Sequence, residues 1–332
     1  MPNGYGRILK SEGGWFTVRL SEAHGGPLDG CTVQARARGV LRGGSLRTAR
    51  NLLAGDLVEV GYDESSYTVD AAGKVTPSTD GTGIRIDRVL PRRNALIRPP
   101  LANLDFLFVT LAVRSPAPDL ETVDKLTCIA VHQKITPVIV ITKCDLDAAE
   151  ADRLAKIYRS AGMDVYPVSS VTGEGIDVLK ARIFTEQDKL AAFAGASGVG
   201  KSTLLNRLFP HLSLATGDLS RRIARGKNTT RTVTLYPLAD DAATGYLADT
   251  PGFTMLDFGQ FDFFGLDDLP ATFPEFAPYL GSCRYTDCTH TKEEECAIVQ
   301  AVRSGEISPS RHQTYCTLYG VLKKKPSYPE KK

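Results

Sequence analysis

The stretch AGASGVGKST, residues 194–203, carries the spacing G-x-x-x-x-G-K-[ST]. An apolar run, LAAFA, precedes its first glycine, and the helix-like STLLNRLF follows its lysine. In a strand–loop–helix of this kind, the backbone N–H groups of the loop and the helix N-terminus attract phosphate. The stretch therefore predicts a phosphate-binding loop formed by Gly195, Ala196, Ser197, Gly198, Val199, Gly200, Lys201, Ser202 and Thr203.

Apolar β-rich runs alternate with helical periodicity around this loop. LDFLFVTLAV (104–113), TPVIVITK (136–143) and DVYPVSS (164–170) each precede a helix-like segment. This alternation indicates a parallel sheet with helices on both faces. The sequence therefore predicts a central α/β P-loop domain over residues 99–258.

A second motif, TKCD, comprises Thr142, Lys143, Cys144 and Asp145 and closes one of the β-rich runs. Ligands bind at the carboxyl edge of such sheets. A carboxylate there accepts two hydrogen bonds from guanine, from N1–H and from the exocyclic amine, whereas adenine has no such pair of donors. After the next predicted strand, backbone groups of Ser169 and Ser170 are expected to contact guanine O6. Together these residues predict a guanine-binding site.

Two further segments suit the γ-phosphate and Mg²⁺. GKNTTRTV (226–233) offers Thr229 and Thr230 as candidates for a switch threonine that senses Mg²⁺. GYLADTPGF (245–253) ends in D-x-x-G, where Asp249 would hold Mg²⁺ through water and the Gly252 N–H would meet the γ-phosphate. Ser202 is the expected direct Mg²⁺ ligand, and Lys201 is expected to reach the β/γ-phosphates.

The order of these elements is unusual. The chain runs from base tetrad to serine loop, phosphate loop, switch threonine and D-x-x-G, which is the usual GTPase order rotated as a circle. A doubly wound domain tolerates such a change when its original termini are close and the new ends fall in an exposed loop. We therefore predict a circularly permuted GTPase that binds GTP or GDP with Mg²⁺.

Three of the seven cysteines and one of the five histidines form a close cluster near the C-terminus. Cys283, Cys288, His290 and Cys296 follow the spacing C-x₄-C-x-H-x₅-C. Three thiolates and one imidazole complete a tetrahedral Zn²⁺ site without an open position, so the expected role is structural. The region from 259 to 332 is therefore predicted to be a mostly helical zinc-binding domain with a basic tail.

Residues 1–98 show short alternating runs separated by turn residues, which predict about five antiparallel strands in a small barrel. Trp15, Phe16 and Tyr67 are expected in its core. Basic residues gather here, although the net charge of the chain is only +2. Such a patch suits RNA phosphates, with a solvated basic face as the alternative. The arginines concerned are Arg36, Arg38, Arg42, Arg47, Arg50, Arg88, Arg92, Arg93 and Arg98.

The bulk properties agree with a multidomain globular protein. The 332 residues are 42% hydrophobic and 23% charged, and the longest apolar runs are too short to cross a bilayer. No signal-peptide pattern opens the sequence, so a cytoplasmic location is expected, without membrane association. Monomer is the expected oligomeric state.

These motifs resemble the circularly permuted GTPases, and among them the bacterial ribosome small subunit-dependent GTPases (the RsgA, or YjeQ/YloQ, family). The resemblance covers nearly the whole chain. It implies an OB-type barrel that binds rRNA, a permuted GTPase domain and a zinc domain. It also implies a role late in assembly of the small ribosomal subunit, GTP hydrolysis stimulated by that particle, and contacts with other assembly factors.

The sequence departs from the usual patterns at two positions. The tetrad begins with Thr142 rather than Asn, which predicts the loss of one orienting amide contact. Asn228 replaces the family's switch histidine, so a water-positioning role assigned to that position is in doubt. In addition, Phe253 follows the D-x-x-G glycine, where many GTPases carry a water-orienting Gln. We therefore expect slow intrinsic turnover that a partner accelerates.

Two other functions remain alternatives at this stage. An ATP-using enzyme, such as a small-molecule kinase, could use the same phosphate loop, but it has no need of the guanine tetrad. An RNA-binding module could hold nucleotide only as a structural ligand. The first would prefer ATP to GTP, and the second would show no turnover even with ribosomal particles present.

Overall fold

The computed structural model describes residues 3–21, 26–39, 52–81, 83–184, 188–212, 233–238, 245–249 and 263–325. The chain packs as two compact units. The first comprises Met1–Asp105, Phe184–Ala192 and Gly217–Gly252, and the second comprises Phe106–Ile183, Phe193–Thr216 and Phe253–Lys332. Within the described ranges, each helix is too short or too polar to cross a membrane.

The first unit contains a closed five-stranded barrel. Its strands are β1 (Asn3–Glu12), β2 (Trp15–Leu20), β3 (Thr32–Ala37), β4 (Leu57–Gly61) and β7 (Arg85–Val89). β1 pairs with both β2 and β4, which closes the ring. Strand directions cannot alternate around a ring of five, so one neighbouring pair must be parallel. That pair is β3 and β7, a departure from the antiparallel barrel that the sequence predicted.

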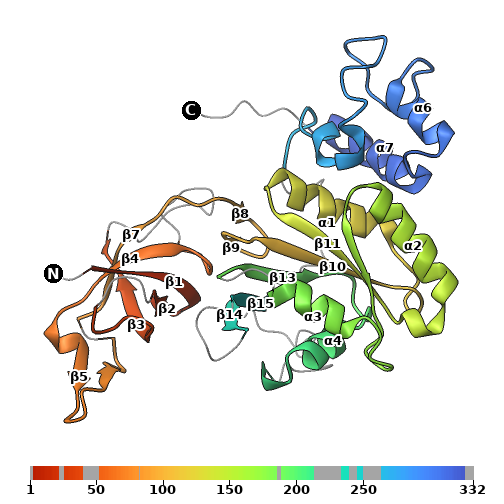
Figure 1. Ribbon diagram of the computed structural model, residues 1–332. Helices are drawn as coiled ribbons and strands as arrows, with labels where there is room; N and C mark the ends of the chain where they lie inside the picture. The colour runs from red at the N-terminus through yellow and green to blue at the C-terminus, as the bar shows by residue number, and fades with distance from the viewer. Residues whose placement is uncertain are drawn as a thin grey trace, which may run out of the picture. The chain divides into compact units, whose positions relative to one another are not determined.

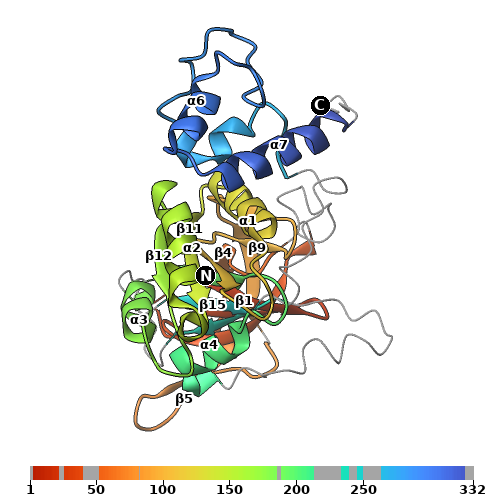
Figure 2. The same ribbon diagram turned by 90° about the vertical axis from the view of Figure 1, so that its right-hand side faces the viewer.

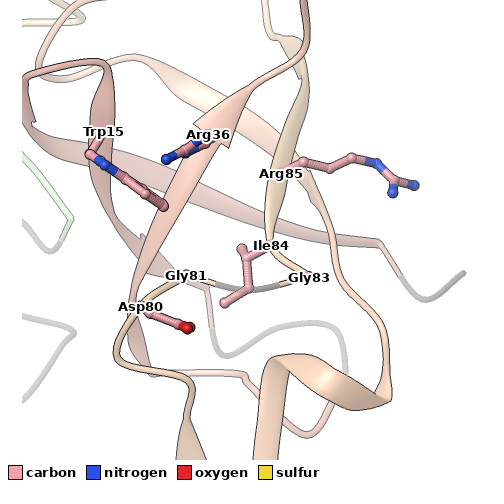
Figure 3. A pocket seen from close by; sticks show the side chains of 7 residues that line it. All are labelled: Trp15, Arg36, Asp80, Gly81, Gly83, Ile84 and Arg85. Atoms are coloured by element: carbon pink, nitrogen blue, oxygen red, sulfur yellow. The ribbon is translucent and has the colours of Figure 1, made fainter.

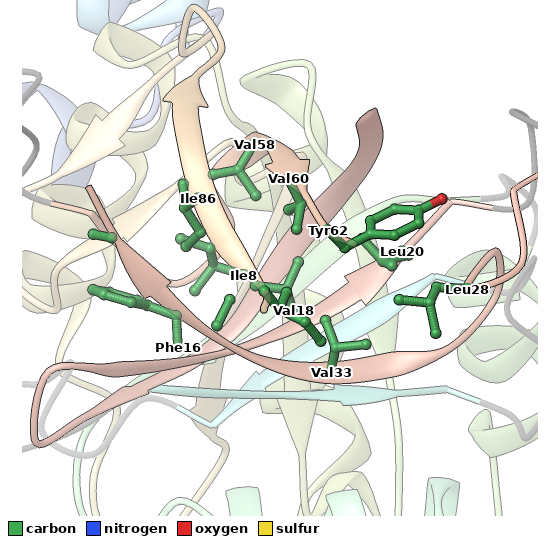
Figure 4. Packing of buried hydrophobic residues seen from close by; sticks show 13 residues of the cluster. Ile8, Phe16, Val18, Leu20, Leu28, Val33, Val58, Val60, Tyr62 and Ile86 are labelled. Atoms are coloured by element: carbon green, nitrogen blue, oxygen red, sulfur yellow. The ribbon is translucent and has the colours of Figure 1, made fainter. Parts of the chain in front are cut away.

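The barrel core follows from the period-2 alternation of these strands. Along β3, Val33, Ala35 and Ala37 are buried, whereas the intervening Gln34 and Arg36 are not. Inward-pointing side chains from all five strands meet in one cluster (Figure 4), which includes Ile8, Phe16, Val18, Leu20, Val33, Val58, Val60 and Ile86. Phe16 therefore lies in the core as expected.

The same unit holds three further groups of strands. β5 (Tyr67–Val69) and β6 (Val75–Pro77) form a separate hairpin, and β8 (Ala95–Leu96) pairs with β9 (Leu101–Ala102). β14 (Thr234–Pro237) pairs antiparallel with β15 (Tyr246–Asp249) and contacts β1. β15 in turn pairs parallel with β13 (Leu190–Ala194).

The second unit has a parallel sheet ordered β12-β11-β10. β10 (Phe106–Ala112) and β11 (Thr136–Thr142) are almost wholly buried, and β12 (Asp164–Pro167) lies beside β11. The helices α1 (Leu120–His132) and α2 (Ala148–Ser160) lie on one face, with α3 (Ile176–Phe184) and α4 (Lys201–Leu208) on the other (Figure 1). Two-sided burial explains why these strands read as continuous apolar runs.

The C-terminal part belongs to this second unit and is mostly helical. Two 3-10 turns, Pro270–Thr272 and Pro274–Phe276, precede the cysteine-rich loop, which leads into α6 (Ala297–Ser304) and α7 (Pro309–Lys323). α7 packs against α1 of the sheet region (Figure 2). The predicted boundary near residue 258 lies outside the described residues.

Candidate guanine-nucleotide site and metal centre

The phosphate loop has the strand–loop–helix form that its sequence predicts. β13 ends at Ala194 and α4 begins at Lys201. Gly195 has φ +145°, and a Cβ there would lie 2.1 Å from the carbonyl oxygen of Thr110, so only glycine fits. Gly198 and Gly200 also have positive φ. This loop brings the backbone close to the N-terminus of α4, where N–H groups favour an anion.

The Lys201 ammonium lies inside this loop. Its Nζ donates hydrogen bonds to the carbonyl oxygens of Gly195 at 2.8 Å and Ala196 at 2.7 Å. Burial lowers the pKa of Lys201, because the charged ammonium loses its water and no counter-ion among the described residues replaces it. A phosphate in the loop would supply that missing negative charge, so the residues present fit such a ligand.

The base tetrad and the phosphate loop are brought together although about fifty residues separate them. Thr142 ends β11, and its Oγ1 lies 2.5 Å from the carbonyl oxygen of Val199 and 3.1 Å from that of Leu111. Lys143 is in the left-handed region, and its Nζ donates to the carbonyl oxygens of Gly198, at 3.0 Å, and Ser115. The two motifs therefore belong to one site despite their inverted order.

Thr142 modifies an expectation from the sequence. The missing asparagine amide predicted a lost orienting contact, yet the threonine hydroxyl itself joins the tetrad to the phosphate loop. Only the tertiary structure reveals this, because Val199 is 57 positions away.

A Thr142→Val variant is expected to weaken GDP binding by about tenfold, the value of one buried hydrogen bond. The shape is kept, but the Val199 carbonyl loses its partner. Thr110→Val is the matched control, because the buried Thr110 hydroxyl has no hydrogen-bond partner among the described residues. Calorimetric titration with GDP checks both variants, and equal affinities would contradict the assigned contact.

The rest of the tetrad faces the serine loop. Asp145 is exposed in a 3-10 turn, Cys144–Leu146, and so is accessible to a base. The backbone N–H of Cys144 donates to Val168 at 3.2 Å, which holds the two loops together. Ser169 is buried, and its Oγ accepts hydrogen bonds from the N–H groups of Val171 and Thr172. Ser169 therefore shapes the loop, also through its N–H, which donates to the Glu174 carbonyl oxygen at 2.9 Å, and Ser170 is half-buried.

The Mg²⁺ and γ-phosphate elements are described only in part. Asp249 ends β15, and burial raises the pKa of its carboxyl group. A nearby cation would reverse that effect. The other predicted switch residues, Asn228, Thr229, Thr230, Gly252 and Phe253, lie outside the described residues.

The four predicted zinc ligands converge. The ligand atoms of Cys283, Cys288, His290 and Cys296 all lie within 4.8 Å of one another. Cys283 Sγ is 3.4 Å from His290 Nδ1 and 3.7 Å from Cys296 Sγ, and Cys296 Sγ is 3.5 Å from the same Nδ1. Tetrahedral bonds of about 2.0–2.3 Å to zinc place neighbouring ligands roughly 3.5–3.8 Å apart. These donors therefore fit zinc.

Groups around the cluster hold its loop in place. His312 Nε2 donates to the carbonyl oxygen of His290, and the Tyr315 hydroxyl donates to that of Thr289, both at 2.8 Å. Burial alone would raise the pKa of Glu293, but hydrogen bonds from the Thr289 hydroxyl and nearby backbone N–H groups lower it to about 2. No sequence motif marks these groups, because their partners are backbone groups and a hydroxyl rather than metal.

A buried ion cluster joins α7 to α1. Arg311, fully buried in α7, donates from Nε and Nη2 to the two carboxylate oxygens of Glu275, at 2.7 and 3.1 Å. Its Nη1 donates to Asp124 Oδ1 at 2.8 Å and to Thr127 Oγ1 at 3.1 Å. Burial disfavours the guanidinium charge, but the two carboxylates outweigh burial and raise the pKa of Arg311 well above its usual range.

The basic patch of the barrel is smaller than the sequence predicted. Arg92 forms a buried ion pair with Asp56 at 2.6 Å, and Arg93 pairs with Asp105, also at 2.6 Å. Arg92 is largely covered in its pair, whereas Arg93 remains exposed. Arg38 and Arg88 are exposed beside Asp87 and Glu59. Arg42, Arg47 and Arg50 lie outside the described residues.

The fold and the site define a circularly permuted P-loop nucleotide-binding domain between a barrel and a cysteine-rich helical region. The RsgA GTPase family model matches residues 89–259. The "Small ribosomal subunit biogenesis GTPase RsgA" of Geobacillus kaustophilus is 37% identical, over 97% of this chain and 99% of its own length. The protein of the same name from Moorella thermoacetica is 41% identical, over 74% of this chain and 81% of its own.

Solved structures agree with these sequence matches. The crystal structure of YjeQ from Thermotoga maritima superposes with a TM-score of 0.73 at 29% identity, over 98% of this chain and all of the other. YloQ, a circularly permuted GTPase, superposes with a TM-score of 0.70 at 28% identity, over 98% of each chain. The chain belongs to the RsgA GTPase family.

Proposed function

We propose that this protein hydrolyses GTP to GDP and phosphate as an assembly factor in late maturation of the small ribosomal subunit. Relatives named as small-subunit biogenesis GTPases span nearly the whole chain. The observation that carries the nucleotide part is the contact between the two motifs: Thr142 and Lys143 hydrogen-bond to carbonyls of the phosphate loop. One nucleotide can then reach Asp145 with its base and Lys201 with its phosphates.

In this proposal each residue has a defined role. Residues 195–203 wrap the phosphates, Lys201 contacts the β/γ-phosphates, and Asp145 accepts from guanine. Mg²⁺, when bound, would neutralise charge that develops on the phosphates. Its expected ligands, directly or through water, are Ser202, Asp249 and one or both of Thr229 and Thr230. Cys283, Cys288, His290 and Cys296 would hold one structural Zn²⁺.

Asp145→Asn tests the base assignment. The amide retains one acceptor but presents N–H donors to guanine N–H groups, so GTP affinity should fall by roughly 10- to 100-fold, the range for one bidentate base contact. Xanthine carries an oxygen where guanine has its amine, so XTP binding should improve. Competition between GTP, XTP and ATP measures the change. A variant that keeps its preference for GTP would remove Asp145 from the base site.

The small subunit should stimulate turnover. Phe253 can orient no water by hydrogen bonding, so the isolated protein is expected to be slow, with the particle completing the site. GTP hydrolysis measured with purified small subunits, and with large subunits as the control, tests this. Stimulation by small subunits alone is the expected result. Equal rates of GTP hydrolysis without particles, with small subunits and with large subunits would refute the proposed role.

The remaining assignments are proposals of the same kind. We place an rRNA-binding OB-type domain at residues 1–98, the GTPase domain at 99–258 and the zinc-binding domain at 259–332. Small-subunit rRNA would be the main partner, with other assembly factors as further ones. We expect a cytoplasmic monomer that does not associate with membranes.

A further inference from the structure

A pocket of about 470 Å³ opens on the barrel, and its lining reaches from surface side chains to Ile84 of the core cluster. Its lining includes Trp15, Arg36, Asp80, Gly81 and Arg85 (Figure 3). This volume lies within the range of small-molecule sites, roughly 300–1,000 Å³. The site lies wholly within the first unit and is separate from the phosphate loop.

The pleat of the sheet brings the first two of these side chains together. Trp15 on β2 lies directly opposite Arg36 on β3, and both point outward because their neighbours point into the core. The Arg36 guanidinium lies 4.1 Å from the centre of the Trp15 ring. Trp15 is half-buried, so the sequence-based expectation of a core residue is wrong in this respect. Its ring instead forms part of a surface platform.

Arg36 differs from three other arginines of the barrel. Arg38 and Arg85 are paired with Asp87, and Arg88 is paired with Glu59. No carboxylate in the described part of the chain forms an ion pair with Arg36, which is exposed. Figure 3 shows Arg85 pointing away from the other labelled side chains. The pocket therefore contains an aromatic–guanidinium pair whose guanidinium forms no ion pair among the described residues, and the Asp80 carboxylate also lines it.

The loop after β6 supplies the opposite wall. Gly81 has φ +69°, and a Cβ there would lie 2.7 Å from both the Trp15 ring and the Gln34 carbonyl oxygen. Only glycine lets the backbone approach the ring so closely. Next to it, Asp80 is exposed, and one of its contacts is a hydrogen bond accepted from the Ser78 hydroxyl. A carboxylate has about four lone-pair positions, so it can accept further hydrogen bonds.

We propose that this pocket binds one unpaired nucleobase of single-stranded RNA, stacked on the Trp15–Arg36 pair, with the adjoining phosphate near Arg36. Aromatic rings and guanidinium planes are the surfaces on which unpaired bases stack. The inference rests on the proposed role of the barrel in RNA binding and names the residues and the ligand. A paired base is excluded, because both of its faces are covered within the duplex.

Asp80 predicts a preference among bases. A carboxylate accepts from N–H donors, and guanine offers two adjacent donors on its Watson–Crick edge. Uracil offers one donor flanked by carbonyl oxygens that would repel the carboxylate. The pocket should therefore prefer guanine to uracil by about tenfold, as bidentate base contacts do.

Trp15 allows a direct test, because it is the only tryptophan in the chain. The full-length protein is saturated with GDP and Mg²⁺ to fill the phosphate loop. It is then titrated with a fluorescently labelled oligouridine that carries one central guanosine, and with the all-uridine control. Tryptophan quenching reports the pocket, and anisotropy of the labelled RNA reports binding anywhere. Guanosine-dependent quenching with about tenfold tighter binding is expected.

Three variants separate the pocket from a general basic surface. Arg36→Ala should weaken binding about tenfold. Lys74→Ala removes an equal charge from an exposed position in the turn between β5 and β6 of the same unit and should have little effect. Asp80→Asn should reduce the guanosine preference while leaving oligouridine binding unchanged. Equal losses in the Arg36 and Lys74 variants would overturn the proposal, as would RNA binding without tryptophan quenching. Quenching by free GMP as strong as that by the oligonucleotide would also overturn it, by identifying a mononucleotide site.

The result of this RNA-binding test does not depend on whether the protein is a GTPase. Small-subunit-stimulated GTP hydrolysis is measured on the same wild-type preparation. Stimulation without quenching would refute the pocket and leave the proposed function intact. Quenching without stimulation would do the reverse.

Discussion

A Cys296→Ser variant is expected to lose one equivalent of zinc and, with it, the folded structure of the cysteine-rich loop and α6. Cys296 is fully buried and occupies two roles, because its Sγ lies in the ligand cluster and also accepts from the Val299 N–H at the start of α6. Structural zinc contributes apparent free energies of about 10–16 kcal/mol in small domains. No other contact in this region approaches that value.

The cluster without metal is poorly stabilised. Burial raises the pKa of Cys288 to about 12, and burial also raises the pKa of Cys296. Without zinc these thiols stay protonated at neutral pH, and weak S–H hydrogen bonds are all that joins them. Zinc must therefore displace protons when it binds, and its affinity should fall as the pH is lowered.

Zinc content and amide hydrogen exchange check this prediction. In Cys296→Ser, protection of the α6 amides should fall to that of an unfolded segment, whereas the barrel strands keep theirs. Cys316→Ser is the control, because Cys316 lies near His312 but outside the four-ligand cluster. It should retain both zinc and protection. A Cys296→Ser protein with full zinc content and native exchange would rule out a structural metal at this site.

An Arg311→Met variant is expected to lose about 3–5 kcal/mol of stability in the second unit, the usual cost of breaking a buried ion pair. Methionine fills most of the space, so the loss comes from Glu275 and Asp124, which remain buried without their cation. From its place on α7, the guanidinium hydrogen-bonds both to α1 and to the turn at Glu275. Its loss should therefore loosen α7 from α1.

Asp124→Asn should cost much less. Arg311 binds Glu275 through two parallel hydrogen bonds, so that pair is already neutral. Asp124 is the second carboxylate, its Oδ2 has no hydrogen-bond partner among the described residues, and burial raises its pKa. An asparagine oxygen can still accept from Arg311 Nη1. Arg311→Met should therefore cost more stability than Asp124→Asn, because only the first leaves two buried carboxylates without a cation.

Hydrogen exchange of α1 and α7 amides under native conditions is the suitable measurement, because Trp15 lies in the barrel and does not report on this cluster. Arg284→Met serves as the control, since Arg284 is an exposed arginine paired with Glu295. Such a pair contributes about 0–1 kcal/mol. If Arg311→Met and Arg284→Met changed exchange equally, the buried cluster would have no special stabilising role.

The elements that the sequence predicted well share one property, which is that neighbouring residues define them. The phosphate loop needs glycines, a lysine and a hydroxyl within one turn. The metal ligands need close spacing, and the buried parallel strands need unbroken apolar runs. The permuted order of the GTPase elements follows from these alone, and the same motifs carry the family resemblance. These features are set by backbone geometry over a few residues, so local sequence is enough to specify them.

Other features were decided only when distant segments packed together. Thr142 replaces an asparagine by reaching a carbonyl 57 positions away, and Arg311 meets Asp124 across 187 positions. Arg92 and Arg93 pair with Asp56 and Asp105, which no local pattern places beside them. Trp15 looked like a core residue until the barrel turned its ring outward toward Arg36. A side chain's local pattern determines its strand or helix, but its partner and its exposure depend on which surface the fold brings within about 3 Å of it.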